Sequence, residues 1–302
     1  MNGSATIKFD VQILRKGTLT RARLAEGIDQ ACFQCEYPLP EYENVTWLGR
    51  GTKKPTMTDT CKICGFSISR ASLQVTMDAL RDRIAHGKGA WLLTLNTEML
   101  SRGARDPGYF ELISQADIIT ADGMPLVWAS WRKGADQAIA GRTTGVDLID
   151  AYLRLPEIPA FAIIGGQSPG MTLQRYGPRA VQSCKYLFDG KVDLSDAQLK
   201  QFVQALTEHE VRTVFIALGV PKQDRLALRL RGMLPHLILM GIGGTFEILG
   251  PHGGRAPRWM QKAGLEWLYR LIKEPARLWR RYLINYPAGI SLLLRDSRSN
   301  GR

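Results

Sequence analysis

The segment AWLLTLN at residues 90–96 decides the fold, because it is a short apolar run that ends in a polar residue and leads into helix-like sequence. The same pattern returns in ADIITAD (116–122), PAFAIIG (159–165), TVFIALG (213–219) and HLILMGI (236–242). Such alternation is typical of parallel strands covered by helices on both faces. We therefore predict an α/β, Rossmann-like fold with a mostly parallel sheet, plus a helical C-terminal appendage.

Two segments before residue 90 extend this pattern. CKICGFSI at 61–68 predicts the first strand of the fold. Leu73, Met77, Leu80 and Ile84 recur at helical spacing, which predicts a helix packed on the sheet.

The chain divides into three predicted parts. Residues 1–59 show no sustained helical or strand period and are rich in turn-forming residues, so we interpret them as an N-terminal appendage. Residues 60–254 form the predicted α/β core. Residues 255–302 form a basic, amphipathic appendage that we expect to dock on a membrane.

Composition excludes several classes of protein. With 302 residues, 45% hydrophobic and 23% charged, the chain is neither disordered nor collagen-like, and five cysteines do not make a disulfide scaffold. The sequence has no apolar run near the roughly 18 residues of a membrane span and no signal-peptide pattern at its start. We expect a cytoplasmic protein.

The charge is unevenly distributed. Residues 255–302 hold eleven Lys or Arg against three Asp or Glu, and so carry most of the net charge of +12. This surplus indicates an anionic partner, which is a nucleic acid, an acidic membrane surface or a phosphorylated substrate.

Polar and glycine residues at the predicted strand ends are the first candidates for a site, because open parallel sheets bind ligands there. Glycines at such joints let backbone N–H groups approach a phosphate, although tight turns alone explain them equally well. The candidates are Thr94, Asn96, Asp122, Gly123, Gly165, Gly166, Gly219 to Gln223, Gly243 and Gly244.

Asp122 ends an apolar strand, where burial would raise the pKa of its carboxyl toward the range of a general base. The alternative is an N-cap for the helix that starts at Met124. The chain has no D-x-D carboxylate pair, so no divalent metal for a nucleoside diphosphate is indicated. Arg or Lys would then stabilise the leaving phosphate.

Six ordered motifs carry a family resemblance: TLNTEML, ITADGMPLVW, GRTTGVDLI, LGVPKQD, GIGGTFEILG and RAPRWMQKAGLEWLYRLIKEPARLWRRYL. Over about residues 60–286 the chain resembles the WecG/TagA/CpsF glycosyltransferases. The resemblance implies a hexosyltransferase that passes a sugar from a UDP-sugar to an undecaprenyl-diphosphate-linked sugar, with inversion and no required cofactor. It also implies a place on the cytoplasmic face of the membrane, in cell-surface polysaccharide or teichoic-acid-type biosynthesis.

The resemblance also assigns roles to residues. Asp122 is similar to the family's proposed catalytic base, Thr94 and Asn96 to pocket residues near the reacting sugar, and Gln223 to a ligand contact. In the matching motifs and joints, further substrate contacts are expected at Arg142, Asp147, Gly165, Gly166, Gly219, Lys222, Gly243 and Gly244. Asp224 departs from the family pattern, which more often has Glu.

The C-terminal stretch reads as a two-sided helix. One arc is basic, and the other side holds Trp267, Leu268, Leu271, Ile272, Leu278, Trp279, Tyr282 and Leu283. Such a helix suits an anionic membrane surface, although a core-packed helix with a solvated basic face is the alternative. Pro275 is expected to split it. The resemblance implies that Arg270, Arg277 and Arg280 fold over the site and contact the diphosphates.

Two C-x-x-C pairs, Cys32 with Cys35 and Cys61 with Cys64, are separated by 25 residues. Their spacing is that of a zinc ribbon with a long linker, so a structural zinc is one reading and reduced, packed cysteines are the other. Cys184 has no partner in this pattern and is expected to be a small core residue.

From the family resemblance we expect UDP-N-acetylmannosamine as the donor. UDP-glucose and UDP-N-acetylmannosaminuronic acid are the alternatives, because motifs this broad do not show which groups of the sugar the pocket contacts. A zinc-containing nucleic-acid-binding protein is the alternative from another class, but charge concentrated beside Trp and Leu argues against it, and we expect no nucleic-acid partner. A dinucleotide-dependent oxidoreductase lacks its glycine fingerprint here. The sequence is compatible both with a monomer and with a homo-oligomer.

Overall fold

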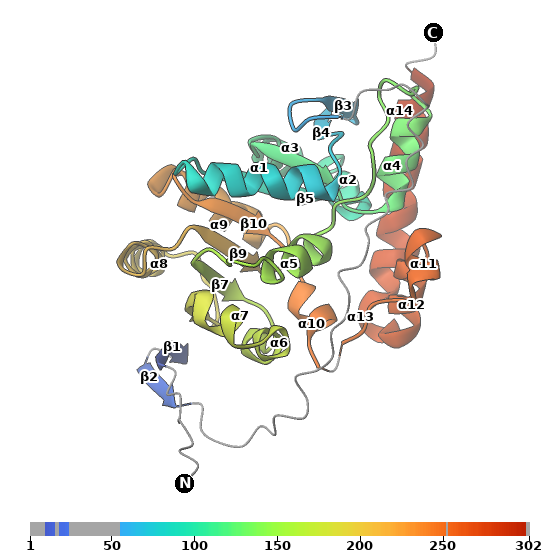
Figure 1. The fold of residues 1–302 in the computed structure, drawn as a ribbon. Helices are drawn as coiled ribbons and strands as arrows, with labels where there is room; N and C mark the ends of the chain where they lie inside the picture. Colours follow the sequence, from blue (N-terminus) through green and yellow to red (C-terminus); the bar gives the residue numbers. More distant parts are fainter. Residues whose placement is uncertain (1–9, 16–17, 24–54, 252, 300–302) are drawn as a thin grey trace.

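The computed structural model describes residues 10–15, 18–23, 55–251 and 253–299 (Figure 1). Its strands are β1 (Asp10–Arg15), β2 (Thr18–Arg23), β3 (Thr60–Ile63), β4 (Phe66–Ser69), β5 (Ala90–Leu95), β6 (Ile118–Ala121), β7 (Phe161–Gly165), β8 (Cys184–Phe188), β9 (Thr213–Ala217) and β10 (Ile238–Gly241). Its helices in the core are α1 (Leu73–Ala85), α2 (Thr97–Gly103), α3 (Pro107–Ser114), α4 (Met124–Trp131), α5 (Gly145–Leu153), α6 (Pro169–Tyr176), α7 (Pro178–Ser183), α8 (Asp196–Glu208), α9 (Lys222–Met233) and α10 (Thr245–Leu249). The C-terminal segment holds α11 (Arg258–Lys262), α12 (Glu266–Lys273), α13 (Pro275–Arg280), the π-helical turn η2 (Arg281–Asn285) and α14 (Tyr286–Ser299).

The main sheet has the strand order β2-β1-β8-β7-β9-β10-β5-β6. All neighbours from β8 to β6 run parallel, which confirms the predicted α/β fold with a mostly parallel sheet. The strands predicted from the five apolar runs are all present, each within its run. β8 was missed, because charged Lys185 interrupts its apolar sequence.

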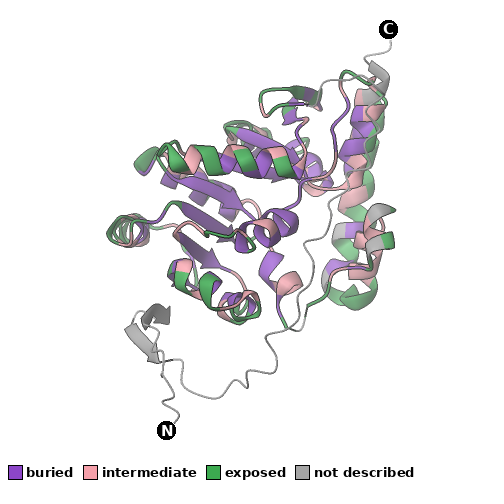
Figure 2. Cartoon of the chain, viewed as in Figure 1, coloured by how far each residue is buried: buried purple, intermediate pink, exposed green. Residues whose placement is uncertain are grey.

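Helices cover both faces of this sheet, and the strands lie buried between them (Figure 2). The strand β5 contributes to two hydrophobic cores, one on each face of the sheet. Trp91, Leu93 and Leu95 belong to the core beneath α2, α3, α8 and α9. Ala90 and Leu92 belong to the core beneath α1, α5, α6 and α7. Alternate residues of one strand therefore supply two cores, which is why the strands are continuous apolar runs.

The N-terminal segment contains two strands that the sequence analysis did not expect. β1 and β2 pair antiparallel, and β1 joins the edge of the main sheet beside β8 through Ile13 and Leu187. The expectation of no sustained strand in residues 1–59 is wrong for these two ranges. In DVQILR, polar Gln12 separates Val11 from Ile13, but apolar Leu14 breaks the alternation, so the segment has no strand period that would predict it.

CKICGFSI was predicted to be one strand of the main sheet, and this is wrong. It forms the hairpin β3–β4, a separate two-stranded sheet. Cys64 and Gly65 turn the chain with φ of +48° and +85°, the left-handed conformation that a tight hairpin turn needs. Cys61, Ile63, Phe66 and Ile68 are buried, so the hairpin packs on the core without joining its sheet.

α1 spans the periodic stretch that the sequence predicted to be a helix. Two other core helices start beside a proline. α6 begins at Pro169 and has no side-chain cap from Ser168, whose backbone is left-handed, and α9 has Pro221 as its N-cap residue.

In the C-terminal segment, α12 ends at the residue before Glu274 and α13 starts at Pro275, which confirms the predicted split. α14 then runs along α2 and α4 (Figure 1). At Gly289 the backbone of α14 lies close to the backbone of α2. A Cβ atom added to Gly289 would lie 2.2 Å from the carbonyl oxygen of Thr97, the first residue of α2. Among the described residues, no helix combines the length and apolar character that crossing a bilayer requires.

The apolar side of the C-terminal segment divides between two environments. Leu278 and Tyr282 are buried, whereas Ile272, Trp279 and Leu283 are 70%, 42% and 59% exposed. The segment therefore contributes some apolar side chains to the core and leaves others exposed, and docking on a membrane stays a prediction.

Candidate active site

A cavity of about 500 Å³ lies at the carboxyl ends of β5, β6, β9 and β10, within the size range of small-molecule sites. Strand-end residues line one side and the C-terminal segment lines the other. Of the predicted site residues, the cavity brings together Thr94, Asn96, Asp122, Arg142, Gly219, Gln223, Gly243, Gly244 and Arg270.

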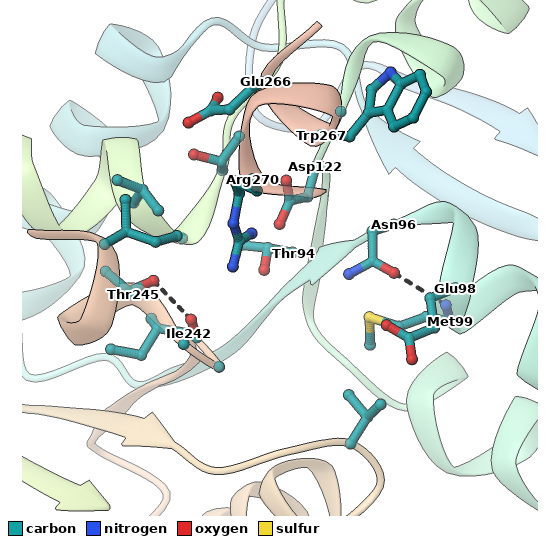
Figure 3. Close-up of a pocket in the computed structure, with 18 of the residues that line it drawn as sticks. Thr94, Asn96, Glu98, Met99, Asp122, Ile242, Thr245, Glu266, Trp267 and Arg270 are labelled. Carbon is teal, nitrogen blue, oxygen red and sulfur yellow. Dashed lines mark hydrogen bonds between the residues drawn. The ribbon is translucent and has the colours of Figure 1, made fainter. Parts of the chain in front are cut away.

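Thr94 and Asn96 follow one another at the end of β5. Thr94 is buried, and its hydroxyl donates to the carbonyl oxygen of Gly241 at 3.4 Å, so it ties β5 to β10. Asn96 is the N-cap of α2, and its Oδ1 accepts from the backbone N–H of Met99 at 3.0 Å. The amide nitrogen of Asn96 points toward the cavity (Figure 3). There it can donate a hydrogen bond to a ligand oxygen.

Asp122 follows β6 and extends its pairing, because its N–H donates to the carbonyl oxygen of Leu95 at 2.7 Å. The N-cap of α4 is Gly123, and no side chain caps this helix. The alternative of Asp122 as the N-cap is therefore wrong. Its half-buried carboxylate instead faces the cavity beside Thr94 and Arg270 (Figure 3).

Gln223, in the first turn of α9, joins two strand-end loops. Its side chain is 5% exposed, and its Oε1 accepts from the backbone N–H of Gly243 at 3.1 Å. This bond fixes the loop after β10 relative to the start of α9, and both border the cavity.

Arg270 and three aromatic side chains form the wall opposite the strand ends. Trp267 lies 5.9 Å from Tyr282 and 6.5 Å from Tyr286, measured between ring centroids, and the two tyrosines meet edge to face at 5.3 Å. The side chain of Arg270 extends from α12 toward Asp122 and Thr94 (Figure 3). The cavity is therefore half-closed by a segment that follows the α/β core in the chain.

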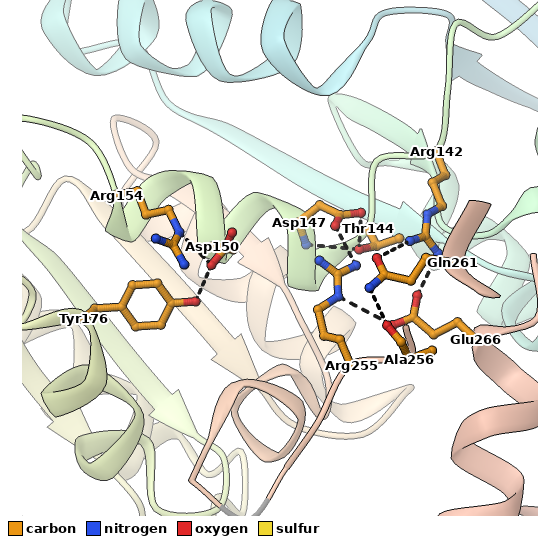
Figure 4. A network of polar contacts seen from close by, with 10 residues as sticks. All are labelled: Arg142, Thr144, Asp147, Asp150, Arg154, Tyr176, Arg255, Ala256, Gln261 and Glu266. Atoms are coloured by element: carbon orange, nitrogen blue, oxygen red, sulfur yellow. Dashed lines mark hydrogen bonds and ion pairs between the residues drawn. The ribbon is translucent and has the colours of Figure 1, made fainter. Parts of the chain in front are cut away.

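Arg142 lies where the core meets this wall (Figure 4). Its guanidinium pairs with the carboxylate of Glu266 at 2.7 Å and donates to Oε1 of Gln261 at 3.2 Å. Nearby, Arg255 pairs with Asp147 at 2.7 Å. Burial by itself would raise the pKa of Asp147, but the charges of Arg255 and Arg142 outweigh burial and hold it below its ordinary value.

Several predicted contacts do not line the cavity: Asp147, Gly165, Gly166, Lys222 and Arg280. The ammonium group of Lys222 donates to the carbonyl oxygen of Val192 at 2.6 Å, away from the cavity. Arg280 is exposed and lies over the ring of its neighbour Trp279 at 5.2 Å. Arg277 belongs to α13, but its side chain lies outside the described part of the structure.

Sequence reasoning missed further polar lining residues, namely Glu98, Thr245, Glu247, Glu266, Tyr282 and Tyr286. Oε2 of Glu247 is buried with no hydrogen-bond partner among the described residues, so it can accept a bond from a ligand hydroxyl. The sequence carried one signal for Glu266, because it is one of three acidic residues in a strongly basic stretch.

Asp224 lies beside Gln223 but faces the interior. Its side chain is fully buried and accepts from the hydroxyl of Tyr109 at 3.0 Å. Burial raises the pKa of the Asp224 carboxyl to about 7, with the hydrogen bond from Tyr109 partly opposing this rise. Asp224 thus links α9 to α3 behind the cavity.

The described residues include two of the four cysteines of the zinc hypothesis. Cys61 is buried in β3 and Cys64 lies in the hairpin turn, and burial raises the pKa of both thiols, that of Cys64 to about 11. Cys32 and Cys35 lie outside the described residues. Zinc therefore stays a prediction, which elemental analysis of the purified protein and of a Cys32→Ser variant would check. Cys184 is buried in β8, as expected.

A comparison with known protein families agrees with this geometry. Residues 61–302 match the sequence model described as the glycosyl transferase WecG/TagA/CpsF family. The match includes the β3–β4 hairpin, the whole parallel core and the C-terminal segment that forms the wall of the cavity.

Proposed function

Because this chain belongs to the WecG/TagA/CpsF glycosyltransferase family, we propose that it moves N-acetylmannosamine from UDP to an undecaprenyl-diphosphate-linked sugar, with inversion at the anomeric carbon. The chain is a hexosyltransferase, and the family in general uses a sugar donor and a lipid-linked acceptor. The convergence of Asp122, Thr94 and Arg270 on one cavity at the strand ends carries the proposal.

In the proposed reaction the acceptor hydroxyl attacks the anomeric carbon directly. The Asp122 carboxylate takes the hydroxyl proton while the new C–O bond forms, and the bond from the anomeric carbon to the diphosphate oxygen breaks. UDP leaves with the bonding electron pair. A single displacement of this kind inverts the anomeric carbon, and it needs one base, which Asp122 supplies.

Charge on the departing diphosphate must be stabilised as it develops. Arg270 points into the cavity opposite the strand ends, and Arg142 lies at its edge. The backbone N–H group of Gly244 adds an uncharged donor to the same site, whereas that of Gly243 is bonded to Gln223. Arginine matches phosphate oxygens with paired hydrogen bonds, so these side chains suit a diphosphate.

The other acidic groups of the cavity favour a neutral donor sugar. Glu98, Glu247 and Glu266 line the cavity together with Asp122, so a sugar carboxylate would meet groups of its own charge. This supports UDP-N-acetylmannosamine or UDP-glucose over UDP-N-acetylmannosaminuronic acid as donor. Carboxylates suit the hydroxyl groups of a neutral sugar or ribose, which donate to them.

A peripheral place on the cytoplasmic face of the membrane fits the outer surface of the C-terminal segment. Ile272, Trp279 and Leu283 are exposed there, and Lys273 and Arg280 lie exposed beside them. Apolar side chains that enter a bilayer, next to cations that attract anionic lipid headgroups, are typical of interfacial helices. An acceptor with a lipid tail would meet the enzyme at such a surface.

The test is a panel of UDP-sugars with a polyprenyl-diphosphate-linked sugar as acceptor, read by UDP release and by the mass of the lipid product. We expect product with UDP-N-acetylmannosamine, and none with Asp122→Asn. Product with UDP-glucose alone would replace the donor and keep the reaction. Absence of lipid-linked product with every donor would overturn the proposal.

A further inference from the structure

Helix α12 carries Arg270 into the cavity, but none of its eight residues is fully buried. Its aromatic contacts, from Trp267 to Tyr282 and Tyr286, are with other parts of the C-terminal segment and not with the α/β core. Helix positions in proteins are normally fixed by a buried apolar face. Polar contacts should therefore contribute to the position of α12 on the core.

Polar contacts join the first residue of α12 to the core (Figure 4). The carboxylate of Glu266 lies between two guanidinium groups, 2.7 Å from Nη1 of Arg142 and 3.6 Å from Nε of Arg255. Arg255 in turn pairs with Asp147 of α5 at 2.7 Å. Gln261 of α11 adds a bond to Arg142 at 3.2 Å.

These charges are shielded and balanced. The side chains of Arg142 and Glu266 are each 16% exposed, Arg255 is 19% exposed and Asp147 is 6% exposed. Two carboxylates face two guanidinium groups, so each charge is compensated. Partly buried pairs of this kind are screened by salt much less than surface pairs are.

The spacing connects this ion network to Arg270. Glu266 and Arg270 are four residues apart on α12, so they lie on the same face of the helix, one turn apart. Both line the cavity. A tilt or slide of α12 that broke the Glu266 pair would also withdraw Arg270.

We propose that Glu266 is a positioning residue: by pairing with Arg142 and Arg255 it holds α12 on the core and so sets Arg270 in the cavity. The role of Arg270 at the diphosphate belongs to the proposed function, on which this part of the inference rests. The anchoring of α12 by Glu266 does not depend on it.

The experiment compares Glu266→Gln with Glu111→Gln, which removes the same charge from an exposed position on α3. The first readout is hydrogen exchange of residues 266–273 without substrate. We expect exchange there to rise about tenfold or more in Glu266→Gln and to stay unchanged in Glu111→Gln. The exchange of β5 and β10 should not change in either variant.

The second readout separates positioning from damage to the site. Because Arg142 loses its neutralising partner, the affinity for UDP should not fall in Glu266→Gln, whereas kcat should fall about tenfold or more as Arg270 is displaced. The double variant Glu266→Gln/Arg270→Ala should be no slower than Arg270→Ala alone, since both changes remove one effect.

The inference would be overturned if hydrogen exchange of α12 were unchanged in Glu266→Gln. It would also be overturned if Glu266→Gln/Arg270→Ala were slower than Arg270→Ala, with the losses in turnover of the two single variants multiplied together. If the parent protein binds UDP but uses no UDP-sugar, the proposed function fails and the exchange of α12 alone decides on Glu266. If α12 exchanges faster but kcat is unchanged, Glu266 anchors the helix without positioning Arg270, and the inference is also overturned.

Discussion

The buried carboxyl of Asp224 should make the enzyme less stable as the pH rises. Burial raises its pKa from an ordinary value of 3.8 to about 7, so the folded protein keeps a proton there that the unfolded chain has already lost. Above pH 3.8 the free energy of unfolding therefore falls, and the loss is complete above about pH 7. At 1.36 kcal/mol for each pH unit, the full effect is about 4 kcal/mol.

Replacing Asp224 with Asn removes this effect, because an amide cannot ionise and its oxygen can still accept from Tyr109. We expect Asp224→Asn to match the parent near pH 4 and to exceed its stability by an amount that grows to about 4 kcal/mol at pH 8. Urea unfolding followed by tryptophan fluorescence at pH 4.5, 6 and 8 measures this difference. Asp78→Asn, at a half-exposed side chain on α1, is the matched control and should show no such trend.

A constant difference between Asp224→Asn and the parent across this pH range would show that the carboxyl is not protonated in the folded protein. A variant less stable than the parent at pH 8 would show that the ionised carboxyl has stabilising partners. Either result would refute the reasoning from burial.

Four further variants test other parts of the structure. Asp122→Asn should lower turnover about 100-fold or more with UDP affinity nearly intact, and near-normal turnover would remove it from the mechanism. Gly289→Ala should destabilise the docking of α14 by about 1–3 kcal/mol, seen as faster proteolysis of that helix, because its Cβ has no room. Gly232→Ala, on α9 with open space around it, should instead stabilise the protein by up to about 1 kcal/mol. The double variant Trp279→Ser/Leu283→Ser should have an affinity for anionic liposomes, measured by sedimentation, that is lower by at least about tenfold. Unchanged affinity would place the membrane contact elsewhere.

The sequence predicted the central sheet well because buried parallel strands leave a strong local signal. Five continuous apolar runs each became a strand, and the polar residues after β5 and β6 meet at one edge as the topology requires. The β3–β4 hairpin was missed because its turn, Cys64-Gly65, lacks the Asn-Gly or Asp-Gly residues that normally mark such turns. Its alternating apolar residues then read as one strand.

The site was predicted best for residues directly at the strand ends. Glu98, Thr245 and Glu247 were missed because they lie in the helices that follow β5 and β10. Glu266 and Tyr286 enter the cavity because tertiary packing brings the C-terminal segment over the strand ends, and no local pattern encodes that. Lys222 illustrates the opposite case, because it sits in a matching motif but donates to the backbone at Val192. Motif position alone did not determine which way its side chain points.

The wall that Leu278, Tyr282 and Tyr286 add to the cavity also bears on which nucleophile can reach the bound sugar. Water competes with the acceptor hydroxyl for the same anomeric carbon, and excluding bulk water is how a transferase avoids becoming a hydrolase. A chain truncated before Gly264 keeps Asp122 and the strand ends but loses this wall. Whatever turnover it retains should release free sugar instead of glycosylated lipid, so the ratio of these two products measures how tightly the C-terminal segment seals the reaction.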